Sequence, residues 1–99
     1  MSKGRTAVFV TFKAKQGHQQ DLKKTLAEQA AAGKNDAGCQ RLELLQSAED
    51  DRTFMFSEVW ENEAALVAHR DLPYLVPFRE RRAPLLDGNP TRTKWAVVD

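Results

Sequence analysis

Residues 53–74 constrain the fold most, because a strand pattern passes into a helix pattern there without a linker. Side chains 53–60 alternate in period two, and both faces are largely apolar. A strand that is apolar on both faces is normally covered on both, which predicts a central strand of a sheet. Asn62 then offers an N-cap for a helix that ends near Leu72, just ahead of Pro73.

The rest of the chain supplies further strands and helices of the same kinds. We expect strands at 5–15, 39–47 and 91–98, and helical segments at 19–32 and 74–82. Gly33 is well placed to end the first helix. In the strand 39–47, Leu42 and Leu44 are expected on one face and Cys39 on the other.

The order of these elements is β-α-β-β-α-β, which is the ferredoxin-like arrangement of an α+β fold with an antiparallel sheet. Helices would cover one face of that sheet. The strands 5–15 and 53–60 are apolar on the second face as well. We therefore expect a second copy of the chain to cover that face, giving a homodimer.

Composition indicates a single globular domain, 1–99. The chain has 41% hydrophobic and 29% charged residues and a net charge of +1. Acidic and basic residues are interspersed, so nothing global favours nucleic acid or an acidic membrane surface as a partner.

Cysteine content and the N-terminus bear on location. Cys39 is the only cysteine, so an internal disulfide is impossible and a reducing compartment is expected. The apolar run in MSKGRTAVFV is too short for a signal peptide, and no later window is long enough to span a bilayer. The sequence therefore predicts a cytoplasmic protein without a membrane partner.

The sequence contains no Gly-rich phosphate loop, no Cys/His metal spacing, no Ser-centred elbow and no nucleotide or flavin fingerprint. If the protein is an enzyme, we expect it to work without a bound organic cofactor or metal. A pocket would then position a substrate that is itself reactive.

Two side chains of the helical region are candidates for proton transfer. His69 is a candidate because imidazole is the usual general base for a phenol or enediol, although a helix histidine bonded to a backbone carbonyl is an equally good interpretation. Tyr74 could pass a proton on, stack against an aromatic ligand, or simply pack.

The strand 53–60 carries a carboxylate, Glu58, between two aromatic residues, Phe56 and Trp60. A lone buried carboxylate is costly, so Glu58 needs a partner or solvent. An arginine such as Arg41 or Arg92 would provide an ion pair that fixes the sheet. Trp60 is expected as a core or pocket-wall residue whose indole N–H needs an acceptor.

The amino-acid sequence around the strand-to-helix junction at 53–74 resembles a known family. SEVWENEAALVAH, a Pro-aromatic pair and PFRERRAPLL are similar to the antibiotic biosynthesis monooxygenase (ABM) domain family, a branch of the dimeric α+β barrel superfamily. The resemblance extends back through AGCQRLELL and forward to the last strand. It implies two sheets packed face to face in a homodimer, with a pocket between sheet and helices in each subunit.

The resemblance also implies a reaction, the oxidation of a small phenol or hydroquinone by dioxygen without a cofactor. In it, His69, with Tyr74, would remove the phenolic proton, and Phe56 and Trp60 would wall the ring. The expected catalytic residues are His69, Tyr74 and Trp60. The expected substrate-binding residues are Phe56, Glu58, Asn62 and Arg92.

Two alternatives stay open at this point. The first is an isomerase of a small phosphorylated keto compound, similar to autoinducer-processing relatives, in which Arg70, Arg79 or Arg92 holds the phosphate. The second is a dimer that binds a small ligand without turnover. Many relatives have an aromatic residue at the position of Leu42 and a histidine at that of Tyr74.

Overall fold

The structure is a computed structural model that describes residues 4–98. The expected domain 1–99 includes residues 1–3 and 99, which lie outside the described part. The elements are β1 (Thr6–Lys13), α1 (Gln19–Gly33), β2 (Cys39–Gln46), β3 (Thr53–Trp60), α2 (Glu63–Arg70), α3 (Leu75–Arg82), the short 3₁₀ helix η1 (Ala83–Leu85) and β4 (Thr91–Ala96). None of the helices within 4–98 is long and apolar enough to cross a bilayer.

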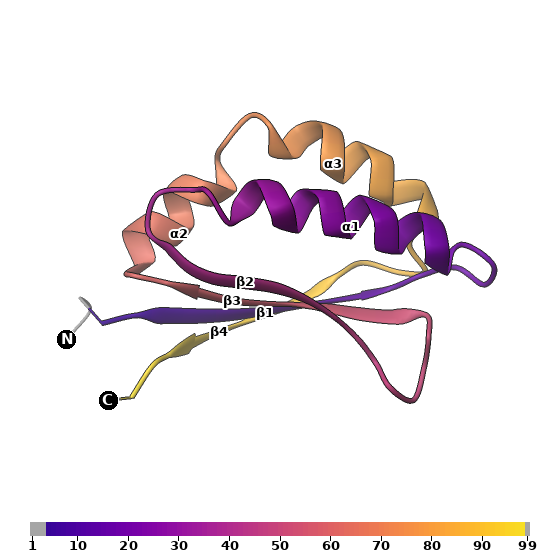
Figure 1. Ribbon diagram of the computed structural model, residues 1–99, viewed down its shortest axis with the longest axis horizontal. Coiled ribbons are helices and arrows are strands. Elements are labelled where there is room, and N and C mark those ends of the chain that lie inside the picture. Colours follow the sequence, from indigo (N-terminus) through magenta and orange to yellow (C-terminus); the bar gives the residue numbers. More distant parts are fainter. Residues whose placement is uncertain (1–3, 99) are drawn as a thin grey trace.

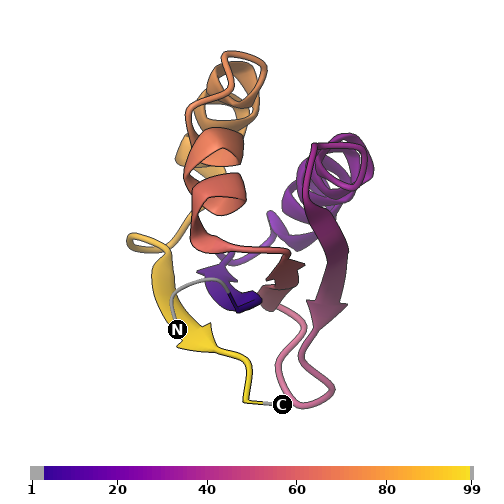
Figure 2. The same ribbon diagram turned by 90° about the vertical axis from the view of Figure 1, so that its left-hand side faces the viewer.

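The four strands form one antiparallel sheet in the order β2-β3-β1-β4. This confirms the ferredoxin-like arrangement and places β3 and β1 at the centre. All helices lie on one face of the sheet, as the two perpendicular views show (Figure 1 and Figure 2). No helix within the described residues lies over the other face (Figure 2).

The core lies between the sheet and the helices. Val10 of β1 pairs with Phe56 of β3, so alternate residues of both strands point towards the helices. Phe12 and Phe56 meet edge to face, with ring centroids 5.2 Å apart. The stripe of α1 expected from the sequence packs against them, with Leu22 and Leu26 fully buried.

Gly33 ends α1, as the sequence predicts, and it has a second role in packing. It is the last residue of α1, and it is absent from the glycines that adopt a positive φ. A Cβ at this position would lie 2.6 Å from Cδ1 of Leu42 and 3.6 Å from Cε1 of His69. The missing side chain therefore also lets α1 approach β2 and α2 closely.

Cys39 lies on the opposite face from the one expected. A β-bulge between Cys39 and Arg41 shifts the register of β2, so that Cys39 pairs with Trp60. Its side chain packs against the core together with Leu44. The irregularity reverses the alternation for the single residue ahead of it, and strict period-two counting missed this.

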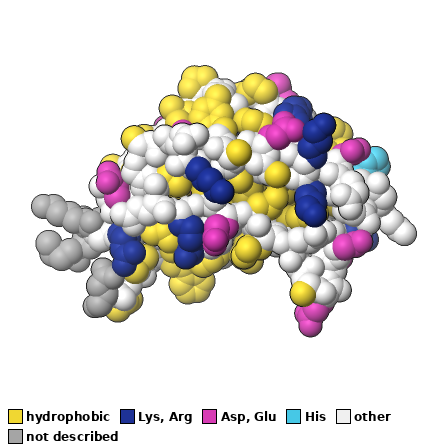
Figure 3. Space-filling model, viewed as in Figure 1, with side chains coloured by type: hydrophobic (Ala, Val, Ile, Leu, Met, Phe, Trp, Pro, Cys, Tyr) yellow, Lys and Arg dark blue, Asp and Glu magenta, His cyan; other side chains and the backbone are white. Residues whose placement is uncertain are grey.

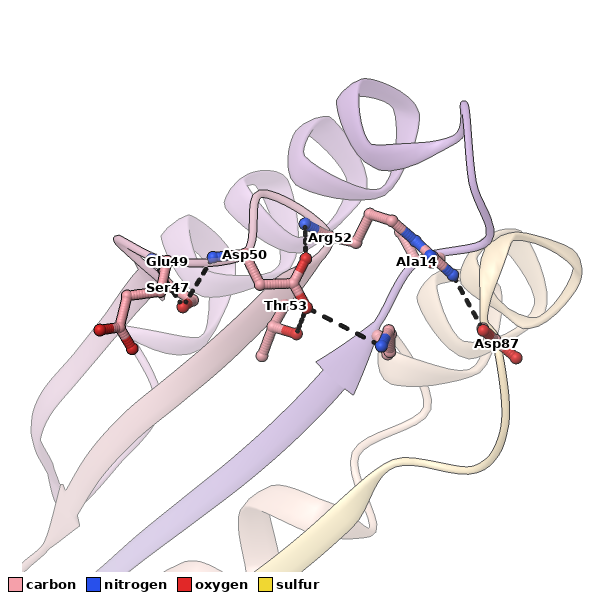
Figure 4. Close-up of polar contacts among 8 residues, drawn as sticks. Ala14, Ser47, Glu49, Asp50, Arg52, Thr53 and Asp87 are labelled. Carbon is pink, nitrogen blue, oxygen red and sulfur yellow. Dashed lines mark hydrogen bonds and ion pairs between the residues drawn. The ribbon is translucent and has the colours of Figure 1, made fainter.

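The acidic connection between β2 and β3 is fastened to the rest of the sheet by Arg52 (Figure 4). Its Nε donates to the backbone oxygen of Ala14 at 2.8 Å, and its Nη2 lies 2.9 Å from Asp87. Asp50 accepts from the backbone N–H of Arg52 and from Thr53. One side chain thus joins the ends of β1 and β3 to the turn before β4.

The second face of the sheet is apolar at its centre and at both edges. Phe9 and Met55 are half-buried there, while Leu45 and Trp95 are 47% and 57% exposed. In the space-filling view, hydrophobic side chains reach the lower surface of the molecule, below the layer of helices (Figure 3). An apolar surface of this kind on a small domain is typical of an interface.

Candidate functional site

A cavity of about 280 Å³ lies between the sheet and the helices. Its walls come from β1, β3 and β4 below and from all three α-helices above. Four of the residues expected at a site line it: Phe56, Glu58, His69 and Arg92. Trp60, Asn62 and Tyr74 do not belong to its lining. Its size suits a small molecule.

His69 is held by a carboxylate that the sequence interpretation did not single out. The Nδ1 atom lies 2.5 Å from Oδ2 of Asp36, and the phenol of Tyr74 donates to the same oxygen at 2.6 Å. Nδ1 therefore carries a proton towards Asp36, which fixes the tautomer and the ring orientation. The other ring nitrogen, Nε2, has no partner among the described residues and is not sealed from solvent.

Trp60 packs against the ring of His69. The rings of Trp60 and His69 stack with centroids 4.4 Å apart and an interplanar angle of 30°. Trp60 is fully buried, and its indole N–H donates to Oε1 of Glu58 at 2.9 Å. The indole thus connects Glu58 and His69, and its N–H has the acceptor that the sequence predicts it to need.

Glu58 sits in an environment that disfavours its charge. The side chain is 5% exposed, and burial raises its pKa; the hydrogen bond from Trp60 and the nearby charges of His69 and Arg92 oppose the rise without cancelling it. The structure contains no ion pair between Glu58 and either expected arginine. Arg41 lies on the other face of the sheet and donates to Ser57 at 2.9 Å.

Tyr74 is a neutral phenol in this site. Burial raises its pKa well above the ordinary range, and donation to Asp36 raises it further. Its hydroxyl faces Asp36 and the end of α1, not the cavity. It therefore serves as a second donor that holds Asp36 in place.

Asn62 begins α2. Its Oδ1 accepts from the backbone N–H of Ala65 at 2.9 Å, which is the N-cap expected from the sequence. The Oδ1 atom is thus engaged in the helix. Lys94 of β4 forms an ion pair with Glu63 in the first turn, which fastens the edge strand to α2.

Asp36 was missed because it lies in the turn between α1 and β2, 33 residues before His69. Turns rich in Asn, Asp and Gly are common, and nothing local marks this one. The topology offered a signal, since Cys39 pairs with Trp60. The turn before β2 must therefore lie beside the start of α2.

Among residues 4–98, no group of three or more His, Cys, Asp or Glu side chains is arranged to hold a metal ion. The chemistry that the described cavity offers comes from an oriented imidazole, a buried carboxyl group and several guanidinium groups. This combination suits proton transfer and the binding of oxygen atoms of a ligand.

Comparisons with known proteins find one matching sequence family and several solved structures with a similar fold. The sequence profile described as antibiotic biosynthesis monooxygenase matches residues 6–81. A solved structure from Pseudomonas aeruginosa has a TM-score of 0.89 at 24% identity, covering 100% of this chain and 99% of that one. SnoaB, a cofactor-independent oxygenase from Streptomyces nogalater, has a TM-score of 0.84 at 17% identity, covering 96% and 94%.

A curated relative is an uncharacterised protein of Synechocystis, 36% identical over 53 residues. The match takes in 54% of this chain and 36% of that protein, so the chain corresponds to about a third of the relative's length.

Proposed function

The chain belongs to the antibiotic biosynthesis monooxygenase family, and from this premise we propose that it oxidises a small phenol or hydroquinone with dioxygen, without flavin or metal. The observation that carries the proposal is His69. Its Nδ1 is held by Asp36, its ring is backed by Trp60, and it lines the cavity. A base fixed in one tautomer at a small pocket is what deprotonation of a phenol requires.

In the proposed reaction, Nε2 of His69 takes the phenolic proton. The resulting phenolate is the reductant for dioxygen. One oxygen atom enters the ring, which becomes a quinone, and the other leaves as water, so the substrate supplies all the electrons. Asp36 stabilises the imidazolium that forms and keeps Nε2 directed away from the turn.

Phe56 provides an apolar wall for the aromatic ring. Glu58 is the polar group beside it, and its raised pKa favours a carboxyl group that can donate a hydrogen bond to a substrate oxygen. Tyr74 contributes by fixing Asp36. Its role in this proposal is positioning, whereas direct proton removal is assigned to His69.

Oxygen uptake with a panel of hydroquinones tests the proposal. His69→Ala should lower the rate about a hundredfold or more, because a positioned base contributes that much. The chain has only one other histidine, His18, which is exposed before α1. His18→Ala is therefore a matched control and should keep the full rate.

Asp36→Asn tests the contribution of the carboxylate that orients His69, the proposed base. The amide cannot stabilise the imidazolium, so the rate should fall at least about tenfold and its pH profile should change. Equal rates in His69→Ala and His18→Ala would remove His69 as the base. Absence of uptake with every hydroquinone would contradict the proposed reaction.

We also propose that a second copy of the chain covers the open face of the sheet. Phe9, Met55, Leu45 and Trp95 lie on that face and support this assembly. Two such faces would bury each other's apolar side chains, as expected of an isologous dimer.

A further inference from the structure

The cavity carries an excess of positive charge. Four arginines line it, Arg70, Arg79, Arg82 and Arg92, against a single acidic side chain, Glu58. None of the four forms an ion pair with a carboxylate within residues 4–98. Guanidinium groups gathered in a hollow without a counter-charge favour an anionic ligand.

Neutral contacts hold two of these guanidinium groups in place. Nη2 of Arg79 donates to the backbone oxygen of Arg70 at 3.0 Å, at the end of α2. Nη1 of Arg82 donates to Gln29 at 2.8 Å, and its guanidinium lies 4.9 Å from the ring centre of Phe12. These contacts fix the positions of the groups and leave their charge uncompensated, with further N–H donors to spare.

The arginines also lie close enough to repel one another. Burial lowers the pKa of Arg82 to about 10, and the charge of Arg79 contributes. Burial also lowers the pKa of Arg92, and the charge of Arg70 adds to this. An anion among them would relieve both effects, since it would replace lost water and offset the mutual repulsion.

We infer that the cavity binds a small molecule that carries an oxyanion group, a carboxylate or a phosphate, held by these arginines. The inference rests on the proposed function in one respect: the reacting ring of the same molecule meets His69. Planar guanidinium groups bind both kinds of oxyanion through paired hydrogen bonds. The substrate class is thereby narrowed to phenols or hydroquinones with an acidic substituent.

A neighbouring cavity indicates where the acidic substituent lies. This second hollow, of about 380 Å³, shares Arg79, Arg82 and Pro90 with the first and lies over the turn before β4. The two arginines therefore stand where both hollows meet. A ligand with its ring at His69 would place its acidic group there and have room to extend further.

Calorimetric titration with unreactive probes tests the inference independently of turnover. Benzoate and phenyl phosphate should bind at least about tenfold more tightly than neutral benzamide, and added salt should weaken them. Benzoate carries a carboxylate and phenyl phosphate carries a phosphate, so a preference for one of them identifies which oxyanion the cavity binds. Arg79→Gln and Arg92→Gln change exposed residues on different elements, α3 and β4, and should each weaken the binding of the anions about tenfold.

Arg81→Gln is the matched control. Arg81 is on the same helix as Arg79 but pairs with Glu28 at 2.9 Å and does not line the cavity. Affinity for the anions should be unchanged in this variant. Equal binding of benzamide and benzoate, or equal losses in Arg81→Gln and Arg92→Gln, would overturn the inference.

The two proposals fail in distinguishable ways. His69→Ala should lose oxygen uptake and keep its affinity for benzoate and phenyl phosphate within about threefold. Anion binding without oxidation of any hydroquinone supports the anion site and contradicts the reaction. Oxidation of neutral hydroquinones by a protein that binds neither anion supports the reaction and overturns the anion site.

Discussion

At the scale of single residues, Glu58 is the side chain that the fold accommodates least well. It is almost fully buried among apolar neighbours, and its pKa is raised by that burial. Because this pKa is higher in the folded than in the unfolded state, the protein has its full stability below the unfolded pKa, near 4.5, where Glu58 is protonated in both states. That stability is lost as the pH rises through the folded value.

Glu58→Gln should therefore stabilise the protein at pH 7 by up to about 1 kcal/mol, because the amide keeps an acceptor for Trp60 and carries no charge. The gain should disappear below about pH 4, where Glu58 is protonated in both states. Urea denaturation at several pH values measures this. Glu49→Gln, in the exposed loop, should show no such dependence. A less stable Glu58→Gln protein at pH 7 would contradict this account.

The chemistry of individual residues could be predicted only where it depended on type and strand alternation. Phe56 and Glu58 share the helix side of β3, as period-two alternation predicts. Asp36 could not be predicted, because its role depends on a tertiary contact with His69 across 33 residues. Arg70, Arg79 and Arg92 were expected as ligands of a phosphate or a substrate, and all three line the cavity, whereas Arg82 was not expected there.

At the scale of elements, the sequence was most informative where local chemistry sets the boundary. Asn62 marked the start of α2 through its side-chain oxygen, and the structure confirms it as the N-cap. Cys39 was placed on the wrong face, and the close packing that Gly33 allows was not predicted, for a shared reason. Close approach of α1 and a bulge in β2 are properties of neighbouring elements, and no pattern within one element records them.

Asn62→Ala tests whether this residue serves the helix or a substrate. The lost cap should lower the free energy of unfolding by about 1 kcal/mol, and Asn62→Ser should recover most of it. The KM for the best hydroquinone should stay within about twofold in both variants. Urea denaturation and oxygen uptake together give the answer. A raised KM with unchanged stability would return Asn62 to the substrate-binding residues.

At the scale of the whole molecule, the ferredoxin-like fold followed from the order and periodicity of the elements.

The same periodicity predicts that a second copy of the chain covers the open face of the sheet, and sedimentation at micromolar concentration tests this prediction. We expect twice the mass of one chain. Trp95→Glu should give monomers, because it places a charge on the open face; Val67→Glu changes a comparably exposed residue of α2 and should not. A monomeric parent protein, or identical behaviour of the two variants, would rule out this interface.

The edge strand β4 serves both sides of the sheet at once. Arg92 pairs with Val10 and points towards the cavity, while Trp95 pairs with Ala7 and points to the open side. Because side chains alternate strictly, a shift of β4 by one position exchanges the two sets. A one-residue shift of β4, such as a shorter or longer turn at 88–90 could impose, would turn the Arg92 guanidinium to the open side and the Trp95 indole towards the cavity. The register of β4 therefore decides which of these two side chains faces the cavity and which faces the open side.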